Sequence, residues 1–274
     1  MNAAWDRAFP NCTHDAAGRR TPQRMRFGLA ALTTPPWAQD IGHTPDPETI
    51  TTLLQTAVEP LVVLDLPATM TPPELPSGSW AVERHTRQTP LQPNEDPVDS
   101  WPSTRRKQLR RAEREGMTVE KTEDLDVLVQ LHQAARDRKG LKSDAQALCT
   151  LLEQLLQESD THAWIVHGSS GNVLAGGVFH GAGDGRCIYG FGGQFRTQAP
   201  GESSRASVLL IATAMRHAAK QGVTTFDFGG SLDQGVDRFY AEFGAERAPK
   251  WRLVRTRGLW KLILRWQRPD LFPG

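Results

Sequence analysis

One acidic residue in the last third of the chain has a setting that suits chemistry. Asp227 stands in the run Phe226-Asp227-Phe228-Gly229-Gly230-Ser231. Because side chains alternate along a strand, its carboxylate faces away from the two rings, either into a groove as a proton acceptor or onto a neighbouring backbone amide. The glycines permit a tight turn and could also let a ligand approach closely, and Ser231 could cap the next helix or bind a ligand oxygen.

Two phenol groups are the next candidates, because the chain has only two tyrosines. Tyr189 ends an expected strand, and Tyr240 lies in an expected helix that follows Asp227. We expect both near a groove between the strands that end at Tyr189 and Phe228. Either hydroxyl is a candidate to protonate a leaving group.

Cations gather in one predicted helix. Arg106, Arg110 and Arg114 are spaced at i, i+4 and i+8, with Lys107 and Arg111 beside them. Such a row could bind phosphate groups, or it could be a solvated face partly neutralised by nearby glutamates. A second basic group brackets Gly140, where the end of a helix favours cations anyway; it comprises Arg136, Arg138, Lys139 and Lys142.

Composition narrows the classes of function. Hydrophobic residues make up 38% and charged residues 23% of the 274 residues, as in a soluble globular protein. A net charge of +1 gives no overall attraction to DNA, and three cysteines are too few for a disulfide scaffold. The histidines lack metal-ligand spacing and no G-x-S-x-G elbow is present, so we expect neither a metal site nor a nucleophilic serine. No secretory signal is evident, and we expect a cytoplasmic protein.

The elements that would position these residues fall into two parts. Residues 1–100 hold most of the prolines, and the proline-rich run 89–102 is the expected boundary. In the first part we expect strands at 26–32, 61–66 and 79–86 and a helix at 47–57. In the second part we expect helices at 103–115, 123–138, 203–220 and 235–243, a helix capped by Ser143, and strands at 117–121, 163–167, 173–180, 186–190, 224–228 and 250–255.

This order of strands and helices resembles the GNAT acyltransferase fold, an α/β (α+β) arrangement with a mixed, mostly antiparallel, twisted sheet flanked by helices. Three segments resemble the Fem-type branch more closely, namely 105–116, 226–231 and 235–245. The resemblance covers about residues 101–257. It implies a shortened, degenerate GNAT-like part at 1–100, an acyltransferase domain at 101–257 and a C-terminal helix or tail at 258–274.

The resemblance also implies an activity. Fem-type enzymes transfer amino acids from aminoacyl-tRNA to peptidoglycan precursors, so the expected acceptor is a small molecule or cell-wall precursor and the expected donor an aminoacyl-tRNA. An amine would attack the activated ester directly. The candidate catalytic residues are Asp227, Tyr189 and Tyr240, and the candidate substrate-binding residues are Arg106, Arg110, Lys139, Phe228, Gly229, Gly230, Ser231 and Arg238. The open alternatives are an acyl-coenzyme A dependent N-acyltransferase and a GNAT-like module that binds without turnover.

The coenzyme A alternative depends on one loop. In GNAT enzymes the pyrophosphate of acyl-coenzyme A sits on amides of a Gln/Arg-x-x-Gly-x-Gly/Ala loop, and 198–203 is a near match with Gly201, Ser203 and Ser204 as candidate cofactor-binding residues. Ser203 could instead cap the helix, with Glu202 complementing its dipole. Because Glu202 would oppose a pyrophosphate, we expect no cofactor, with acyl-coenzyme A reserved for the alternative.

Two further expectations concern helices. The helix at 203–220 should pack across the sheet with Val208, Ile211 and Met215 buried and with Arg216 and Lys220 exposed. The apolar and basic run 251–266 could touch a membrane surface as an amphipathic helix, or it could pack back on its own domain. Any membrane contact would therefore be peripheral.

Overall fold

The fold is given by a computed structural model, which describes residues 13–15, 18–24, 30–33, 47–230 and 233–273. The chain forms two compact units, one from Met1–Thr86 with Arg247–Gly274 and the other from Arg87–Glu246. This division differs from the boundary expected at 89–102. The proline-rich run belongs to the second unit because its apolar residues Leu91, Val98 and Trp101 are buried in that unit's core.

The second unit contains a mixed sheet with strand order β5-β10-β9-β8-β7-β6. Its strands are β5 (Ser79–Pro90), which begins in the first unit, β6 (Thr118–Lys121), β7 (His162–His167), β8 (Val173–Gly181), β9 (Arg186–Gln194) and β10 (Thr225–Asp227). Neighbours are antiparallel except β9 and β10, which are parallel. The expected mixed, mostly antiparallel sheet is confirmed.

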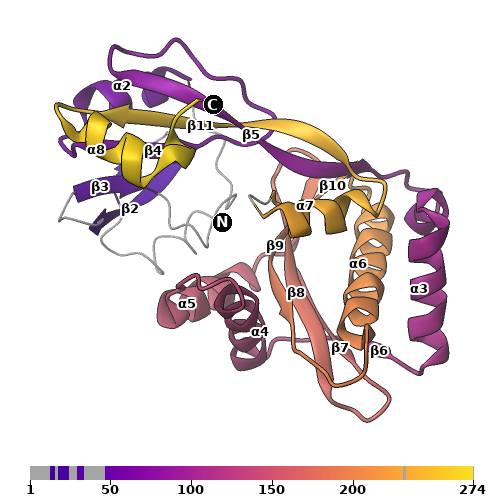
Figure 1. Ribbon diagram of the computed structural model, residues 1–274. Coiled ribbons are helices and arrows are strands. Elements are labelled where there is room, and N and C mark those ends of the chain that lie inside the picture. The colour runs from indigo at the N-terminus through magenta and orange to yellow at the C-terminus, as the bar shows by residue number, and fades with distance from the viewer. Residues whose placement is uncertain (1–12, 16–17, 25–29, 34–46, 231–232, 274) are drawn as a thin grey trace. The chain divides into compact units, whose positions relative to one another are not determined.

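Helices cover both faces of this sheet, as Figure 1 shows. The helices are α3 (Ser103–Arg114), α4 (Leu125–Asp137), α5 (Ala145–Leu155), α6 (Glu202–Lys220), α7 (Gln234–Ala241) and the 3-10 turn η2 (Pro97–Ser100). In the figure α4 and α5 lie on one side of β7, β8 and β9, and α6 and α3 lie on the other.

The long helix α6 packs as predicted. Val208, Ile211 and Met215 are fully buried, because their i, i+3, i+7 spacing turns them all toward the sheet. Lys220 is exposed, whereas Arg216 is half-buried in an ion pair with Asp96 in which Nη2 and Oδ2 are 2.7 Å apart.

Two helix caps differ from those that the sequence favours. Ser103 and Thr104 both suit the N-cap of α3 by residue type, but Ser103 is already the first residue of the helix, and Pro102 precedes it without a capping side chain. The cap of α5 is Asp144 rather than Ser143, and its carboxylate accepts a hydrogen bond from the amide of Ala147 at 3.0 Å. A carboxylate at this position satisfies a free amide and also complements the helix dipole, which favours it over the neighbouring serine.

The first unit has the strand order β1-β2-β3-β4-β11-β5. Its elements are β1 (Thr13–Asp15), β2 (Gly18–Arg24), β3 (Ala30–Thr33), β4 (Leu61–Asp65), β11 (Glu246–Thr256), α2 (Pro47–Thr56), α8 (Trp260–Gln267) and the 3-10 turn η3 (Pro269–Leu271). The expected strand at 26–32 lies partly outside the described residues. Ile50 and Leu54 of α2 pack on one set of strand side chains and Leu264 of α8 on another.

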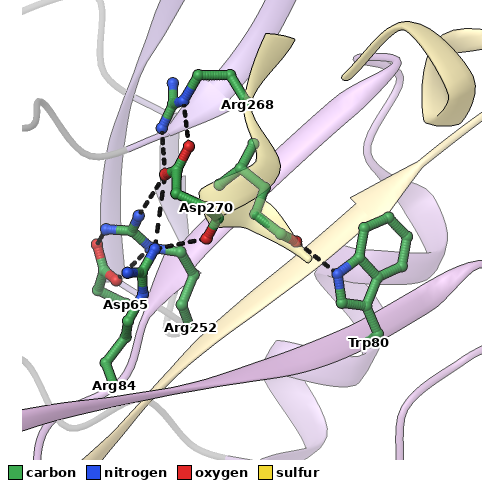
Figure 2. A network of polar contacts seen from close by, with 7 residues as sticks. Asp65, Trp80, Arg84, Arg252, Arg268 and Asp270 are labelled. Atoms are coloured by element: carbon green, nitrogen blue, oxygen red, sulfur yellow. Dashed lines mark hydrogen bonds and ion pairs between the residues drawn. The ribbon is translucent and has the colours of Figure 1, made fainter. Parts of the chain in front are cut away.

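A charged network ties the end of the chain to this unit (Figure 2). Arg252 donates to both oxygens of Asp65, at 2.7 and 2.9 Å. Arg84 donates to the main-chain oxygen of Asp270 at 2.6 Å, and Arg268 donates to the Asp270 carboxylate at 2.8 and 2.9 Å. Strand β11, far along the chain, thereby joins the strands formed before residue 87.

Candidate active site

The candidate site lies where β9 and β10 stop pairing. Their parallel register runs from Thr225 opposite Arg186 to Asp227 opposite Ile188, and β9 then continues to Gln194 beside β8 alone. Gly229 adopts a positive φ of 74° just after β10, and a Cβ there would lie 2.8 Å from the carbonyl oxygen of Tyr189. Only glycine fits this approach, so the turn brings the end of β10 against Tyr189.

Asp227 holds these strand ends together. The residue is 2% exposed, and its Oδ2 accepts hydrogen bonds from Gln88 Nε2 at 2.8 Å and Arg186 Nη1 at 3.0 Å. Its Oδ1 accepts from the amide of Gly229 at 2.8 Å. Of the two orientations predicted from the sequence, the structure has the one that reaches a neighbouring amide. Residues from β5, β9 and β10 converge here, so Asp227 positions the turn.

The two tyrosines lie next to each other within a cluster of aromatic rings. The ring of Tyr189 is stacked on Phe179 at 4.7 Å between centroids and meets Tyr240 edge-on at 6.4 Å. A Cβ at Gly177 or Gly192 would lie within 2.5 Å of the Tyr189 side chain, so these glycines leave room for its ring on the sheet. The ring of Tyr240 lies 4.6 Å from that of Phe228.

The electrostatic setting keeps both phenols protonated. Burial raises the pKa of Tyr189 above its usual range, and burial together with the neighbouring Tyr189 raises the pKa of Tyr240. Neither hydroxyl donates a hydrogen bond to any other residue that the structure describes. The pair can therefore serve as hydrogen-bond or proton donors to a ligand, and not as bases at neutral pH.

Helix α7 is fixed next to this pair by three ion pairs. Arg87 of β5 donates to both oxygens of Asp237 at 2.7 and 2.9 Å. Lys139, predicted to bind substrate, lies 3.2 Å from the carboxylate of Asp233, which caps α7. Arg105 of α3 bonds to Glu242 and stacks on the ring of Phe239 at 4.6 Å.

The remaining predicted substrate-binding residues differ in accessibility. Phe228 is fully buried and belongs to the core, whereas Gly229 and Gly230 are half-buried and Arg238 is exposed. Ser231 lies outside the described residues. Gln88 and Arg186, which donate to Asp227, were not predicted from the sequence. They reach Asp227 because β10 pairs with β5 and β9, and such pairings between distant segments leave no local sequence pattern. Gln88 also stands next to the run 89–102, which was expected to be a linker.

A basic depression lies on α3, apart from the tyrosine pair. It has a volume of about 710 Å³ and is lined by Lys107, Arg110, Arg111, Glu113 and Arg114. Arg110 is exposed, and the half-buried Arg106 has an Nε without a hydrogen-bond partner among the described residues. Figure 1 shows α6 between α3 and strands β7 to β9.

The predicted cofactor-binding residues lie at the start of α6. Ser203 is buried and its hydroxyl donates to the carbonyl of Phe195 at 2.6 Å, so it is turned inward. Arg205 is held by Glu115 at 2.7 Å and by the carbonyl of Pro200 at 3.2 Å, and it fills the space beside Gly201. Ser204 is half-buried, and Glu202 adds a negative charge to the first turn. A dianion here would have the carboxylate of Glu202 in the same helical turn.

Other kinds of site find little support in the described part of the chain. No three His, Cys, Asp or Glu side chains come together there as metal ligands. Burial, aided by the charges of Asp160 and Asp227, raises the pKa of the Cys187 thiol to about 12, which makes it a poor nucleophile. Across those same residues, no helix combines the length and the apolar character needed to span a bilayer.

Comparisons with known proteins agree with the fold. The family described as an acetyltransferase (GNAT) domain matches residues 103–243. FemX is similar in structure, with a TM-score of 0.60, 15% identity and coverage of 91% of this chain and 85% of its own. The C-terminal domain of a lysylphosphatidylglycerol synthetase from Agrobacterium fabrum has a TM-score of 0.60 and 12% identity, over 98% of this chain and 91% of its own. A search of curated proteins gives no significant match. At these identities the structural likeness shows the fold.

Proposed function

Because this chain belongs to the GNAT acetyltransferase family, we propose that it is an acyltransferase of the Fem type, which moves an aminoacyl group from an activated ester to an amine. The observation that supports this most is the pair of uncommitted phenols, Tyr189 and Tyr240, beside the glycine turn at the end of β10. The acceptor is a small molecule or a cell-wall precursor that carries a primary amine.

The reaction needs only steps that these residues can assist. A neutral amine attacks the ester carbon, the carbonyl oxygen becomes an oxyanion, and collapse of the intermediate expels the donor's hydroxyl oxygen, which takes up a proton. A phenol that stays protonated can donate to the oxyanion or to the departing oxygen. The amine loses one proton and the leaving alcohol gains one, so the step balances without a covalent enzyme intermediate.

The donor is proposed to be an aminoacyl-tRNA. The depression on α3 presents Lys107, Arg110 and Arg114 together, and clustered cations of this kind bind successive phosphates of a nucleic acid. At the start of α6, by contrast, Glu202 places a negative charge in the first turn, where it would oppose a coenzyme A pyrophosphate. The cation-lined surface would hold the nucleic acid, and the phenol-lined surface of the same unit would hold the ester end.

The test is a transfer assay with the Tyr189→Phe and Tyr240→Phe variants. Mixed aminoacyl-tRNA serves as donor and a nucleotide-linked peptidoglycan precursor as acceptor, and transfer of the labelled amino acid is measured. Each variant removes one hydroxyl and keeps the ring, so we expect kcat to fall about 100-fold or more with little change in KM. Unfolding temperatures equal to that of the parent protein would show that the packing is intact.

Two results would count against the proposal. Full activity in both variants would remove the phenols from the reaction. Binding of donor and acceptor, seen as a raised melting temperature, with no transfer by the parent protein would instead indicate a module that binds without turnover.

A further inference from the structure

The C-terminal helix α8 presents an apolar row to solvent. Leu259, Leu262 and Trp266 are 77%, 69% and 83% exposed, and Ile263 is 38% exposed. Their positions at i, i+3, i+4 and i+7 place them on one stripe of the helix. Among the described residues, six large apolar side chains are exposed, and four of them are in this stripe.

The inner face of the same helix is already used. Leu264 is 2% exposed in the core of the first unit, and Trp260 packs against that core. Trp80 anchors the chain end beyond the helix, because its Nε1 donates to the carbonyl of Leu271 at 2.6 Å and its ring stacks on Phe272 at 5.0 Å. Helix α8 therefore cannot turn its outer row inward without breaking these contacts.

A row of cations runs along the neighbouring stripe. Lys261, Arg265 and Arg268 follow at i, i+4 and i+7, and Arg257 precedes the helix. The twelve residues of the segment from Arg257 to Arg268 include four cations and no acidic residue. Asp270 takes up part of this charge by pairing with Arg268, while Lys261 and Arg265 remain exposed.

We propose that α8 docks this protein on an anionic membrane surface, with Leu259, Leu262, Ile263 and Trp266 entering the headgroup region and Lys261 and Arg265 beside the lipid phosphates. The row of cations favours an anionic membrane as the partner. An apolar stripe beside cations, in a segment that contains no acidic residue, is complementary to an anionic bilayer. Tryptophan is also the side chain that favours the boundary between headgroups and acyl chains. The protein would then bind the membrane surface as a peripheral protein.

Co-sedimentation with lipid vesicles tests the proposal on the full chain. We expect binding to vesicles that contain anionic phosphatidylglycerol and much weaker binding to vesicles of neutral phosphatidylcholine. Lys261→Gln and Arg265→Gln should each weaken binding to the anionic vesicles about fivefold, the ratio that corresponds to about 1 kcal/mol per cation near the surface. Leu262→Ala combined with Trp266→Ala should weaken it at least tenfold.

Matched variants elsewhere control for a general reduction of charge or apolar area. Val58, 82% exposed in the same unit, and Lys142, exposed in the other unit, provide Val58→Ala and Lys142→Gln, which should bind vesicles like the parent protein. Equal binding by the α8 variants and the parent would overturn the proposal. It would also fail if the parent ignored anionic vesicles but formed dimers that the Leu262 and Trp266 substitutions dissolve, since the stripe would then cover a second copy.

Discussion

Asp227 and the two tyrosines lie close to one turn, and their neighbours give them different roles. The carboxylate of Asp227 is occupied by Arg186, Gln88 and the amide of Gly229, which suits a residue that positions the strand ends. The phenols of Tyr189 and Tyr240 have no such partners among the described residues and remain free to donate. All three residues are candidates by residue type. Their surroundings in the structure distinguish Asp227, which positions the strand ends, from the tyrosines, which can donate a proton.

The first prediction concerns the effect of a buried histidine on α4 on the pH dependence of stability. Burial and the charge of Arg136 lower the pKa of His132 to about 4, and both ring nitrogens lack partners among the described residues. In the unfolded chain its pKa is about 6.5, so the unfolded state binds more protons as pH falls from 7 toward 4. Stability from the neutral ring is therefore full above about pH 6.5 and is lost on acidification, by up to about 3 kcal/mol.

The His132→Leu variant should remove this part of the acid sensitivity. Urea unfolding of the parent and variant at pH 7, 5.5 and 4.5 measures it, and the stability of the variant relative to the parent should rise as pH falls. The other histidines with lowered pKa are present in both proteins and cancel in the comparison. Two unfolding free energies that change in parallel with pH would contradict the assignment to His132.

At the scale of elements, periodicity predicted the helices well and the ends of strands less well. Helix α6 matches the expected range apart from one additional residue at its start. The match is close because the apolar stripe defines the body of the helix and Gly222, which has a positive φ, defines its end. Strand β9 runs to Gln194 rather than 190, since Gly192 and Gly193 interrupt the strand-like pattern but pair with Gly177 and Gly176. Gly177 and Gly192 leave room for the Tyr189 ring, so part of the site depends on residues that carry no side chain and give no sequence signal.

Helix α6 also carries a prediction about coenzyme A. Because Glu202 opposes a pyrophosphate at the helix start and Ser203 is turned inward, we expect no measurable binding by calorimetric titration of the parent protein. Glu202→Gln should gain at most about fivefold to tenfold in affinity, which corresponds to about 1 kcal/mol of repulsion relieved. Tight binding of coenzyme A by the parent would reject the aminoacyl-tRNA donor and favour an acyl-coenzyme A enzyme.

Helix α3 carries the matching prediction for the nucleic acid. Neutralising Arg110→Gln and Arg114→Gln should weaken tRNA binding and make its dependence on salt less steep, by about 0.7 to 0.9 in the log-log slope for each phosphate that the helix no longer neutralises. Filter binding across a range of salt concentrations measures both effects, with Lys261→Gln in the other unit as the control. Affinity and slope equal to those of the parent would identify the α3 face as solvated charge.

At the scale of the whole molecule, the two units interleave in sequence. The first unit is closed by strand β11 and the tail, which follow the entire second unit along the chain. Some contacts in the first unit join residues that are more than 180 positions apart, and such contacts leave no local sequence pattern. For this reason the sequence predicted a boundary near residue 100 and assigned β11 to the second domain. The Asp65–Arg252 ion pair, on β4 and β11, is a specific link across that separation.

The last prediction concerns this closure. Asp270 contacts Arg84, Arg252 and Arg268, and their positive charges lower the pKa of its carboxyl. Asp270→Ala leaves three arginines near the single carboxylate of Asp65, so we expect the first unit to lose about 1–3 kcal/mol of stability. Because the pKa values of Asp65 and Asp270 are both lowered in the folded protein, their contribution to stability is present above about pH 4 and is lost as pH falls below it.

Hydrogen exchange measures the effect of Asp270→Ala. Exchange should become faster in β4 and β11 at neutral pH and remain unchanged in β7 and β8, whereas Glu153→Ala at an exposed site should change neither region. Equal acceleration in both units would mean that the two unfold together, and the tail would then stabilise the chain as a single cooperative body.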